Sequence, residues 1–268
     1  MFHLEDKVAI ITGGAGVLGS AMARGLAQAN VKVAILSRTP GKVAAQVQNI
    51  QRGGGEALGL VADVLDRAQL VTCREQVLSV WGKINILINC AGGNKAGATI
   101  MPNQTFFDLS LDDFDQVTAL NLKGTVLPTL VFGEVMAEQR KGCIINISSM
   151  AAQLPLTRVF GYSASKAAVE NMTKWLAVEM ANKYGPGIRV NAIAPGFFIG
   201  EQNRRLLLEE DGSLTARGKT IISQTPMGRF GEPEDLCGAV NWLCSDAANF
   251  VTGTVINIDG GFGAFAGV

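Results

Sequence analysis

Short runs of β-branched and other apolar residues alternate along this chain with longer segments in which apolar residues recur every three or four positions. The second kind is clear after Gly16, where Leu18, Met22 and Leu26 fall on one helical stripe. Several short runs are apolar throughout, as expected when helices cover both faces of a parallel sheet. The alternation predicts an α/β protein with a doubly wound parallel sheet of about seven strands and right-handed crossovers. The expected strands are 7–12, 31–36, 57–62, 84–89, 143–148, 188–194 and 254–259.

One segment, 197–225, departs from this alternation. It is polar and charged, and it lies between two predicted strands. Ligands of open α/β sheets bind at the carboxyl ends of the strands, where this segment begins. We therefore expect a small substrate lid, with a plain surface insertion as the alternative. No linker or repeat divides the chain, so residues 1–268 are expected to form a single domain.

The composition disfavours several kinds of partner. Lysine plus arginine equals aspartate plus glutamate at 23 each, so no net field favours nucleic acid or an anionic membrane. The five cysteines form no C-x-x-C pair and the single histidine is His3, so no metal site is expected. No apolar run approaches about 20 residues, and the first residues lack the regions of a signal peptide. We expect a cytoplasmic protein that acts on a small molecule.

A glycine-rich stretch, ITGGAGVLGS, links the first predicted strand to the first predicted helix. Gly14, Gly16 and Gly19 in this stretch follow the pattern G-x-G-x-x-G. Glycines at such a turn let the backbone approach a pyrophosphate, which the free N–H groups and the helix dipole then bind. The turn predicts a Rossmann dinucleotide site, and a tight turn without a ligand is the alternative.

The end of the second strand bears on which nicotinamide cofactor binds. An acidic residue there would accept the ribose 2′-hydroxyl and repel a 2′-phosphate. This chain has Ser37 and Arg38 instead, a hydroxyl and a guanidinium that suit a phosphate dianion. The pair favours NADP(H) over NAD(H). NAD(H) stays open as the alternative, because an arginine at a strand end is common on protein surfaces.

Further motifs follow one another along the whole chain. In order they are Thr12-Gly13, Asp63, Asn89-Cys90-Ala91-Gly92, Asn121, Ser149, Tyr162-x-x-x-Lys166, Pro195-Gly196, Pro226-Met-Gly-Arg229 and Asp259-Gly-Gly261. This order resembles that of the short-chain dehydrogenase/reductase family nearly from end to end. The joint match is far more specific than any single motif.

The resemblance implies a nicotinamide cofactor, catalysis by Ser149, Tyr162 and Lys166, and a homotetramer formed by helix pairing. It also implies which residues contact the cofactor. These are Gly13, Gly14, Gly16, Val17, Leu18, Gly19, Ser37, Arg38, Asp63, Val64, Asn89, Ala91, Gly92, Tyr162, Lys166, Pro195 and Gly196.

Two positions depart from the family pattern. The usual turn is T-G-x-x-x-G-x-G, and here Val17 occupies the place of the middle glycine because Gly16 comes one residue early. We expect pyrophosphate contact to survive, while the local path of the backbone is left open. Gly200 occupies the place where a threonine often holds the nicotinamide amide, so that contact must come from another group or be lost.

Tyr162 and Lys166 lie one helical turn apart, on the same face. A free tyrosine has a pKa near ~10 and is a poor base at neutral pH. The Lys166 ammonium, helped by a positive nicotinamide ring, is expected to lower that pKa by stabilising the phenolate. Tyr162 would then be the general acid in ketone reduction and the general base in alcohol oxidation.

Two further residues complete the predicted catalytic set. Ser149, at the end of the fifth strand, is expected to donate a hydrogen bond to the substrate carbonyl oxygen, with Ser148 as the competing assignment. By resemblance, Asn121 holds a water that links Lys166 to solvent as a proton relay. The alternative for Asn121 is a buried amide that satisfies helix backbone groups.

Two other function classes are weighed against a dehydrogenase. Ser163 and Lys166 fit the S-x-x-K pattern of a serine hydrolase, but the sequence lacks the accompanying K-T-G, S-D-N and G-x-S-x-G elements. Hydrolysis is therefore disfavoured. A cofactor-binding regulator without turnover is a distant alternative, because such proteins typically lose one member of the Ser-Tyr-Lys set.

Polar side chains around the predicted crevice indicate a hydroxylated, carboxylated substrate. An arginine grips a carboxylate with two hydrogen bonds; Arg158 is the first choice for this role and Arg204 the second. The surrounding segments resemble bacterial enzymes described as D-mannonate oxidoreductases or fructuronate reductases, and less closely gluconate 5-dehydrogenases. We expect a keto sugar acid such as D-fructuronate, with 3-oxoacyl-carrier-protein reduction as the alternative. The expected substrate contacts are Ser149, Tyr162, Asn94, Gln153, Arg158 and Arg204.

Overall fold

The structure, a computed structural model, describes residues 2–200 and 203–267. All seven predicted strands are present and pair in parallel in the order β3-β2-β1-β4-β5-β6-β7. The prediction of a doubly wound parallel sheet is therefore confirmed. The strands are β1 (Val8–Thr12), β2 (Lys32–Ser37), β3 (Ala57–Val61), β4 (Ile86–Asn89), β5 (Gly142–Ile147), β6 (Ile188–Pro195) and β7 (Val255–Ile258).

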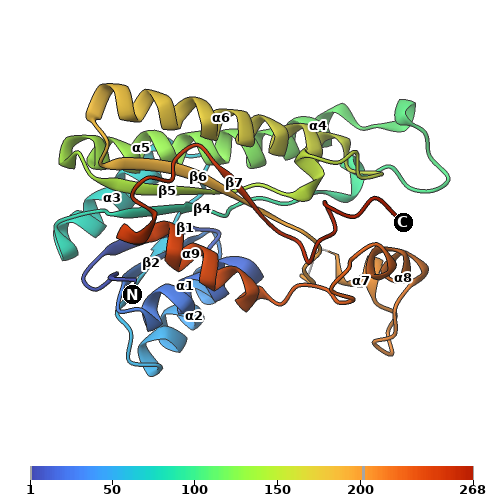
Figure 1. The fold of residues 1–268 in the computed structure, drawn as a ribbon, viewed down its shortest axis with the longest axis horizontal. Helices are drawn as coiled ribbons and strands as arrows, with labels where there is room; N and C mark the ends of the chain where they lie inside the picture. Colours follow the sequence, from blue (N-terminus) through green and yellow to red (C-terminus); the bar gives the residue numbers. More distant parts are fainter. Residues whose placement is uncertain (1, 201–202, 268) are drawn as a thin grey trace.

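Helices cover both faces of the sheet, and Figure 1 shows the layers. One face carries α1 (Val17–Gln28), α2 (Pro40–Arg52) and α9 (Cys237–Cys244). The other carries α3 (Arg67–Trp81), α5 (Gly124–Gln139) and α6 (Phe160–Tyr184), with α4 (Leu111–Thr118) packed on α6. Shorter elements are the 3₁₀ helices η1 (Ala96–Ala98), η2 (Phe106–Asp108), η4 (Met150–Ala152), η5 (Pro233–Leu236) and η6 (Asp246–Ala248), and the π-helix η3 (Ala119–Lys123).

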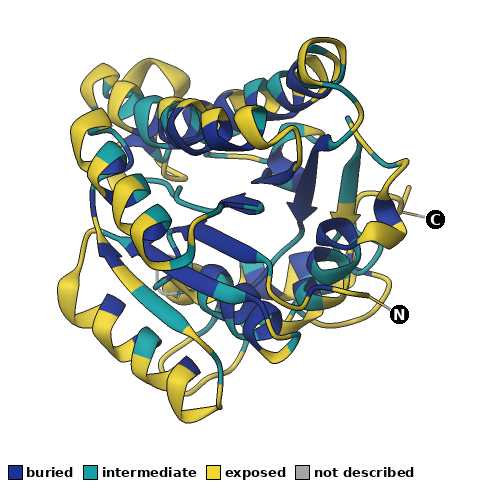
Figure 2. Ribbon diagram, turned by 90° about the vertical axis from the view of Figure 1, so that its left-hand side faces the viewer, coloured by how far each residue is buried: buried dark blue, intermediate teal, exposed yellow. Residues whose placement is uncertain are grey.

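Each strand supplies apolar side chains to two cores. In β1, Ala9 and Ile11 pack towards α1 and α9, whereas Val8 and Ile10 pack towards α3 and α5. All four side chains are fully buried, and the buried centre of the fold is visible in Figure 2. Burying an isoleucine stabilises a fold by roughly 2 kcal/mol relative to leaving it exposed. The central strands are therefore a firm support for the residues at their ends.

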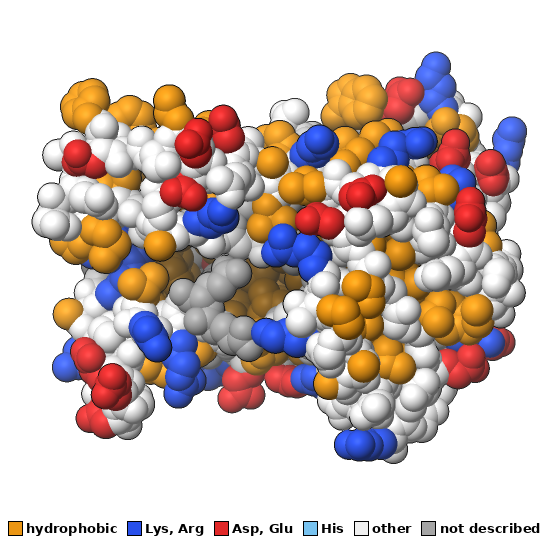
Figure 3. All heavy atoms as spheres, turned by 180° about the vertical axis from the view of Figure 1, so that it is seen from behind, with side chains coloured by type: hydrophobic (Ala, Val, Ile, Leu, Met, Phe, Trp, Pro, Cys, Tyr) orange, Lys and Arg blue, Asp and Glu red, His pale blue; other side chains and the backbone are white. Residues whose placement is uncertain are grey.

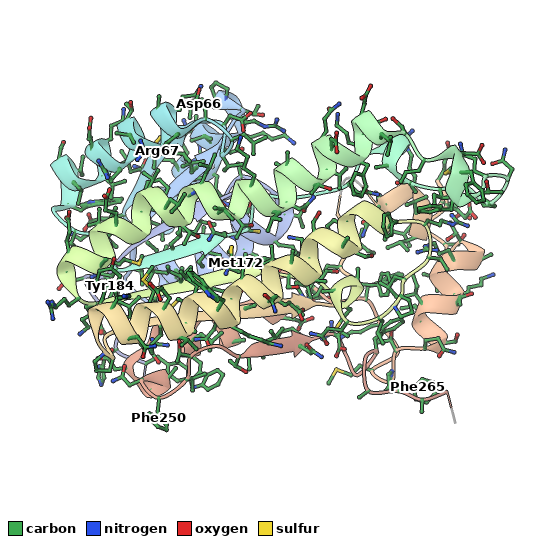
Figure 4. All side chains as sticks on the ribbon, turned by 90° about the horizontal axis from the view of Figure 1, so that it is seen from above. Asp66, Arg67, Met172, Tyr184, Phe250 and Phe265 are labelled. Carbon is green, nitrogen blue, oxygen red and sulfur yellow. The ribbon has the colours of Figure 1, made fainter. Side chains whose placement is uncertain are left out.

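Local signals set where several helices begin and end. The Asp66 carboxylate accepts hydrogen bonds from the backbone N–H groups of Ala68 and Gln69, which starts α3. Gly82, with a left-handed backbone, ends the same helix. Figure 4 shows α6 running from the end of the molecule that carries α8 to Tyr184 at the opposite end. The first turn of α6 thus lies at the carboxyl ends of the strands.

The strand order reverses between β1 and β4. These two strands are neighbours, and the register places their last residues, Thr12 and Asn89, opposite one another. The chain crosses to one face of the sheet after β1 and to the other after β4, which opens a crevice between the connections. This topological switch point is where a doubly wound fold binds its ligand.

The predicted lid, 197–225, contains two short helices, α7 (Arg204–Leu207) and α8 (Ala216–Ser223). Both lie beyond the carboxyl end of the sheet, and the C-terminal end of the chain runs nearby (Figure 1). Figure 3 shows the molecular surface hollowed beside them, with apolar side chains inside the hollow. Positions 201–202 lie outside the described residues, and the lid function of the segment stays a prediction.

Candidate active site

The turn between β1 and α1 is built on close approaches of the backbone. Gly13 has a left-handed backbone with φ +65°, a conformation that costs a residue bearing a Cβ roughly 1 kcal/mol. A Cβ at Gly13 would fall 2.9 Å from the Ala91 Cα, and one at Gly19 would fall 2.3 Å from the Gly13 carbonyl oxygen. Both glycines are thus required by the turn itself.

Val17, the departure from the family turn, has a structural explanation. α1 begins at Val17, and Gly16 is its N-cap with φ −84°. Val17 is not among the residues with positive φ, so its backbone conformation accepts a side chain. Val17 is 38% exposed. Leu18 packs against the core instead. No side chain caps α1, which leaves its first N–H groups free to bind an anion such as pyrophosphate.

Thr12 joins the glycine turn to the residues that follow β4. Its hydroxyl oxygen is fully buried and accepts hydrogen bonds from the N–H groups of Cys90 and Ala91, both at 3.1 Å. The chain after β4 is thereby held against Gly13. This contact places Ala91 and Gly92 at the switch point, next to the predicted pyrophosphate site.

Asn89 points into the core. Its Nδ2 donates to Thr129 Oγ1 at 2.9 Å and to Asn146 Oδ1 at 2.8 Å, and the residue is 2% exposed. The side chain therefore links β4 to β5 and α5. A cofactor contact by Asn89 stays a prediction. Because the side-chain nitrogen is engaged in the core, the backbone of Asn89 would make that contact.

The ends of β2 and β3 lie side by side, with Ser37 opposite Val61. Beyond them, Arg38 Nη1 lies 3.8 Å from Asp63 Oδ2, and the Arg38 side chain is 66% exposed. An exposed ion pair of this kind contributes about 0–1 kcal/mol, so the guanidinium is free to turn towards a ligand. Val64, which follows Asp63 in the chain, is buried, and its side chain lies against Gly124 at the start of α5.

Lys166 is a buried cation one turn along α6 from Tyr162. It is 4% exposed, and its Nζ donates to the Ile147 carbonyl oxygen at 2.7 Å. The same nitrogen lies 5.6 Å from the centroid of the Tyr162 ring. Burial lowers the pKa of Lys166 to about 8, against a smaller opposite effect of Cys90. Lys166 thus still carries its proton at neutral pH.

Tyr162 lies in the first turn of α6 and shares a hydrogen bond with Ser149. Burial raises the pKa of Tyr162, and the hydrogen bond with Ser149 lowers it by less. The lowering that we expected from Lys166 is not produced by the protein's own groups. Desolvation of a phenolate is the larger effect, and Lys166 Nζ is directed to the Ile147 carbonyl. The phenol is therefore protonated at neutral pH, the form that a general acid needs.

The two adjacent serines have different surroundings. Ser149 Oγ accepts from the Ala151 N–H at 3.2 Å, at the start of η4, and faces Tyr162. Ser148 is 2% exposed, and its hydroxyl donates to the Glu170 carboxylate at 2.8 Å. The structure thus brings Ser149, and not Ser148, to Tyr162.

Gln153, a predicted substrate contact, belongs to the same hydrogen-bond network as Ser148. Its Nε2 lies 3.0 Å from Glu170 Oε1 and 3.0 Å from Asn257 Oδ1. Its Oε1 accepts from Asn257 Nδ2 at 3.0 Å. The Gln153 amide thus forms hydrogen bonds with residues of α6 and β7. A substrate contact by Gln153 stays a prediction, and making it would require breaking one of these hydrogen bonds.

Asn121 is fully buried within the π-helix η3. Its Nδ2 donates to the carbonyl oxygens of Gly93 at 2.7 Å and Val117 at 2.8 Å, and its Oδ1 accepts from the Gly93 N–H at 3.1 Å. A Cβ added to Gly92 would fall 2.7 Å from Asn121 Oδ1 and 3.3 Å from Lys166 Nζ. Asn121 therefore supports backbone groups, as the alternative interpretation expected, and also lies near Lys166. The water relay stays a prediction.

The end of β6 brings Pro195 and Gly196 to the same edge of the sheet. Gly196 N–H donates to the Ile258 carbonyl at 2.9 Å, which holds this edge to β7. Further on, the Gly200 N–H donates to Asn203 Oδ1 at 2.7 Å, and Asn203 Nδ2 donates to the Phe198 carbonyl at 2.8 Å. The turn that lacks the usual threonine is therefore held by Asn203.

A separate cavity of about 390 Å³ lies between the β6 end and the C-terminal segment. Phe197, Met227 and Asp259 are among its lining residues, and Ser149, Tyr162 and Lys166 are not. Phe262 packs edge-on against Phe197 with ring centroids 5.0 Å apart. The C-terminal segment thus packs beside this cavity, and a Cβ at Gly263 would fall 2.3 Å from the Met150 side chain.

The predicted substrate contacts are spread around the mouth of the crevice. Asn94 Nδ2 donates to Thr99 Oγ1 at 2.7 Å, and Arg204 is exposed at the start of α7. Arg158 is partly buried, with a left-handed backbone of φ +79°, and its carbonyl accepts from the Ile100 N–H at 3.0 Å.

Arg217 is a neighbour of this group that sequence reasoning missed. It lies on α8, and its Nη1 donates to Thr157 Oγ1 at 3.4 Å, directly beside Arg158. Arg217 and Thr157 are 60 positions apart in the chain. No local pattern distinguished Arg217 from an ordinary surface arginine.

Ser163, the serine of the hydrolase alternative, is not set up as a nucleophile. Its Oγ is buried and has no hydrogen-bond partner among residues 2–200 and 203–267. Lys166 Nζ instead binds the Ile147 carbonyl. The geometry therefore lacks the nucleophile–base contact that such a hydrolase needs.

Within residues 2–200 and 203–267, no group of three or more His, Cys, Asp or Glu side chains is arranged to hold a metal ion. In the same residues, no helix combines the length and the apolar character of a membrane span.

Comparison with known proteins decides the family. The short-chain dehydrogenase model described as enoyl-(acyl carrier protein) reductase matches residues 13–263. The chain belongs to the short-chain dehydrogenase/reductase family. The resemblance seen in the sequence is therefore confirmed over nearly the whole chain.

Curated relatives of this short-chain dehydrogenase include UxuB of Bacillus subtilis, an uncharacterised oxidoreductase. It is 46% identical over 275 residues, which cover 99% of this chain and 98% of the relative. A 3-oxoacyl-[acyl-carrier-protein] reductase of Thermotoga maritima is 35% identical over 259 residues, covering 97% and 98%.

Solved structures agree with this assignment. A Haemophilus influenzae protein, proposed to be a D-mannonate oxidoreductase and bound to NAD, matches with a TM-score of 0.92 at 41% identity, covering 100% of this chain and 98% of the other. A gluconate 5-dehydrogenase of Burkholderia cenocepacia, in complex with NADP and tartrate, matches with a TM-score of 0.86 at 32% identity, covering 98% and 97%. This short-chain dehydrogenase is thus a nicotinamide-dependent oxidoreductase.

The residues present fit such a cofactor. The bare backbone of the glycine turn and the uncapped α1 suit a pyrophosphate, and Arg38 stands where the adenosine ribose would lie. From the predicted phosphate site, the crevice at the switch point extends towards Tyr162 and Lys166. The position of each catalytic and cofactor contact stays a prediction.

Proposed function

We propose that this short-chain dehydrogenase interconverts the ketone and the secondary alcohol of a sugar acid, reducing D-fructuronate to D-mannonate. The observation that carries the reaction is the Tyr162 phenol, protonated and hydrogen-bonded to Ser149, with the Lys166 ammonium 5.6 Å from its ring centroid. The likeness to the Haemophilus influenzae protein and the cations around the crevice support a sugar acid as the substrate.

The proposed mechanism divides the work among three side chains. Ser149 and Tyr162 donate hydrogen bonds to the substrate carbonyl oxygen and orient it. Bound nicotinamide supplies the hydride to the carbonyl carbon. As negative charge develops on the oxygen, Tyr162 transfers its proton to that atom. Lys166 holds a positive charge beside the phenolate that results, and in alcohol oxidation the phenolate takes the proton back.

The proton of Tyr162 is then restored from solvent. We propose that Lys166 and a water at Asn121 form this route. Asn121 Oδ1 accepts one hydrogen bond, from the Gly93 N–H, and an amide oxygen has a second lone pair. Both residues flank Gly92, which supports a short path between them.

NADP(H) is the proposed cofactor. Its 2′-phosphate would be bound by Ser37 and by Arg38, whose side chain is exposed and only loosely paired with Asp63. Arg38→Gln should raise the KM for NADPH about tenfold or more and leave the KM for NADH nearly unchanged. A lower KM for NADH than for NADPH in the unaltered protein would reject this preference in favour of NAD(H), the cofactor of the Haemophilus influenzae relative.

Two other reactions remain candidates. Reduction of 5-ketogluconate is supported by the Burkholderia cenocepacia enzyme, whose structure holds tartrate, a hydroxylated dicarboxylate. Reduction of a 3-oxoacyl-carrier protein is supported by the Thermotoga maritima relative. The non-catalytic regulator is less well supported, because Ser149, Tyr162 and Lys166 are all present and face one another.

One assay separates these candidates. The protein is incubated with NADPH or NADH and, in turn, with D-fructuronate, 5-keto-D-gluconate and an acetoacetyl thioester, and consumption of the reduced nicotinamide is followed. D-Fructuronate should give the highest kcat/KM. Preference for the thioester would replace the proposed function with a 3-oxoacyl reductase, and absence of turnover with all three would favour a regulator.

We also propose a cytoplasmic homotetramer that pairs through α5 and α6. Its support is the outward apolar surface of these helices, where Leu130, Trp175 and Val178 are 60%, 64% and 61% exposed. Light scattering should give four times the chain mass of 28.2 kDa. Trp175→Glu should reduce that mass, and an unchanged mass would place the interface elsewhere.

A further inference from the structure

Two arginines from different elements lie near the loop that precedes α6. Arg158 lies in the loop that leads from η4 into α6, and Arg217 lies on α8. The hydrogen bond from Arg217 Nη1 to Thr157 Oγ1, at 3.4 Å, holds the Arg217 guanidinium against the residue that precedes Arg158. Burial and the charge of Arg158 both lower the pKa of Arg217. Figures 1 and 4 show α8 at the same end of the molecule as the start of α6.

No carboxylate of the described residues pairs with either arginine. Among residues 2–200 and 203–267, the ion pairs formed by arginine involve Arg24, Arg38, Arg74 and Arg229. Two like charges close together and partly removed from water repel one another and have lost part of their hydration. An anion between the two guanidinium groups would relieve both costs, so the pair is suited to bind one.

The site lies within reach of the reacting phenol. Arg158 precedes Tyr162 by four residues, and α6 begins between them at Phe160. The N-terminal end of a long helix adds a partial positive charge to the same place, and no side chain caps α6. An anionic group held here would lie at one end of a short substrate while the ketone at its other end reaches Ser149 and Tyr162.

The backbone conformation of Arg158 supports a defined direction for its side chain. Its φ of +79° is uncommon for a residue with a long side chain and costs about 1–3 kcal/mol. The hydrogen bond from the Ile100 N–H to the Arg158 carbonyl, at 3.0 Å, helps to hold this conformation. A freely solvated surface arginine needs no such support, which agrees with a defined direction for this side chain.

We propose that Arg158 and Arg217 together form the carboxylate subsite of the active site, and that Arg217 determines selectivity for acidic over neutral substrates. This inference rests on the proposed function, because it takes the substrate to be a sugar acid. Paired guanidinium groups bind a carboxylate through charge-assisted hydrogen bonds that a neutral sugar cannot form. The same chemistry would also bind a phosphate, as on an acyl-carrier prosthetic group.

The first test measures turnover by the unaltered protein and the Arg217→Gln, Arg217→Lys and Lys219→Gln variants. Lys219 is an exposed cation on the same helix and serves as the matched control. Substrates are D-fructuronate, its neutral counterpart D-fructose and an acetoacetyl phosphopantetheine thioester. Arg217→Gln should lower kcat/KM for D-fructuronate about 10- to 100-fold, chiefly through KM. D-Fructose turnover should change little, Arg217→Lys should recover part of the loss, and Lys219→Gln should behave as the unaltered protein.

Equal losses for D-fructuronate and D-fructose would overturn the subsite, because a carboxylate contact cannot affect a neutral sugar. A loss confined to the thioester would also overturn it and assign the arginines to a phosphate.

The second test needs no turnover and so separates this inference from the proposed reaction. Binding of D-mannonate to the NADP⁺-saturated protein is measured by calorimetry in the Tyr162→Phe background, with and without Arg217→Gln. Weaker binding in the double variant would support the subsite even if the reaction proved to be another one. Equal binding in both would overturn the subsite even if D-fructuronate proved to be the substrate.

Discussion

The inner and outer ends of this active site are held in different ways. At the inner end, Lys166 and Asn121 are 4% and 0% exposed, and each hydrogen-bonds to backbone carbonyl groups. At the outer end, Arg158 and Arg217 are partly exposed and have no carboxylate partner among the described residues. The comparison teaches that the core fixes the groups proposed for proton transfer, whereas the groups proposed for substrate choice lie on surface elements outside it. Changes at the inner end should therefore alter kcat, and changes at the outer end should alter KM.

The largest effect is expected from Tyr162→Phe at the inner end. The variant keeps the ring and loses the transferable proton, so kcat should fall by about 10³-fold or more. Cofactor binding, measured by fluorescence titration with NADPH, should be nearly unchanged. Turnover close to that of the unaltered protein would show that Tyr162 is not the proton donor.

Ser149→Ala should have the next largest effect on turnover. Removing a hydrogen-bond donor to the developing negative charge lowers kcat by about 10²–10³-fold in comparable sites. Ser148→Ala is the matched control. It should chiefly lower the free energy of unfolding, by about 1–3 kcal/mol, because it removes the buried donor to Glu170. If Ser148→Ala lost more activity than Ser149→Ala, the two assignments would be reversed.

The pH dependence should differ between the two directions of the reaction. Burial raises the pKa of Tyr162, so the phenol stays protonated at neutral pH. Alcohol oxidation needs the phenolate and should accelerate as the pH rises above neutral. Ketone reduction needs the phenol and should slow only at alkaline pH. Oxidation that is already independent of pH at neutral pH would mean that the pKa of Tyr162 lies below its ordinary value.

Lys166→Met tests whether burial of the ammonium costs stability. The unfolded lysine keeps its proton up to about pH 10.5, and the folded one releases it near pH 8. Between these values the unfolded chain binds more protons, so stability rises with pH. The variant should lack this gain of about 3 kcal/mol between pH 8 and 10.5, as judged by denaturant titration. Identical pH slopes in the two proteins would show that Lys166 is not desolvated.

The smallest effect is expected from Ser163→Ala. The Ser163 hydroxyl has no hydrogen-bond partner within the described residues, so its removal should leave kcat unchanged and raise stability by up to about 1 kcal/mol. Thermal unfolding and initial rates measure both quantities. A large loss of turnover would return Ser163 to the active site and reopen the hydrolase interpretation.

Much of the fold was predictable because its signals are local. The apolar runs located all seven strands, and the spacing of Tyr162 and Lys166 placed both side chains on one face of α6. The conformation of Val17 was not predictable, because the start of α1 depends on how the turn packs against Ala91. The burial that raises the pKa of Tyr162 was not predictable either, since the depth of burial of a side chain is set by the assembled layers, and the expected lowering with bound nicotinamide stays a prediction.

By itself, the sequence determined the alternation of strands and helices and the glycine turn, which depend on periodicity and short spacings. The predicted set of Ser149, Tyr162 and Lys166 came from a resemblance to the family along nearly the whole chain. Only the tertiary structure decided that Gln153 bonds to Asn257, 104 positions away, and that Arg217 bonds to Thr157, the residue before Arg158. Such contacts depend on where whole elements pack. The sequence around either residue contains no pattern that identifies its distant partner. The kind of reaction could therefore be predicted from motifs in the sequence, whereas the proposed carboxylate subsite became visible only when α8 packed beside the loop that precedes α6.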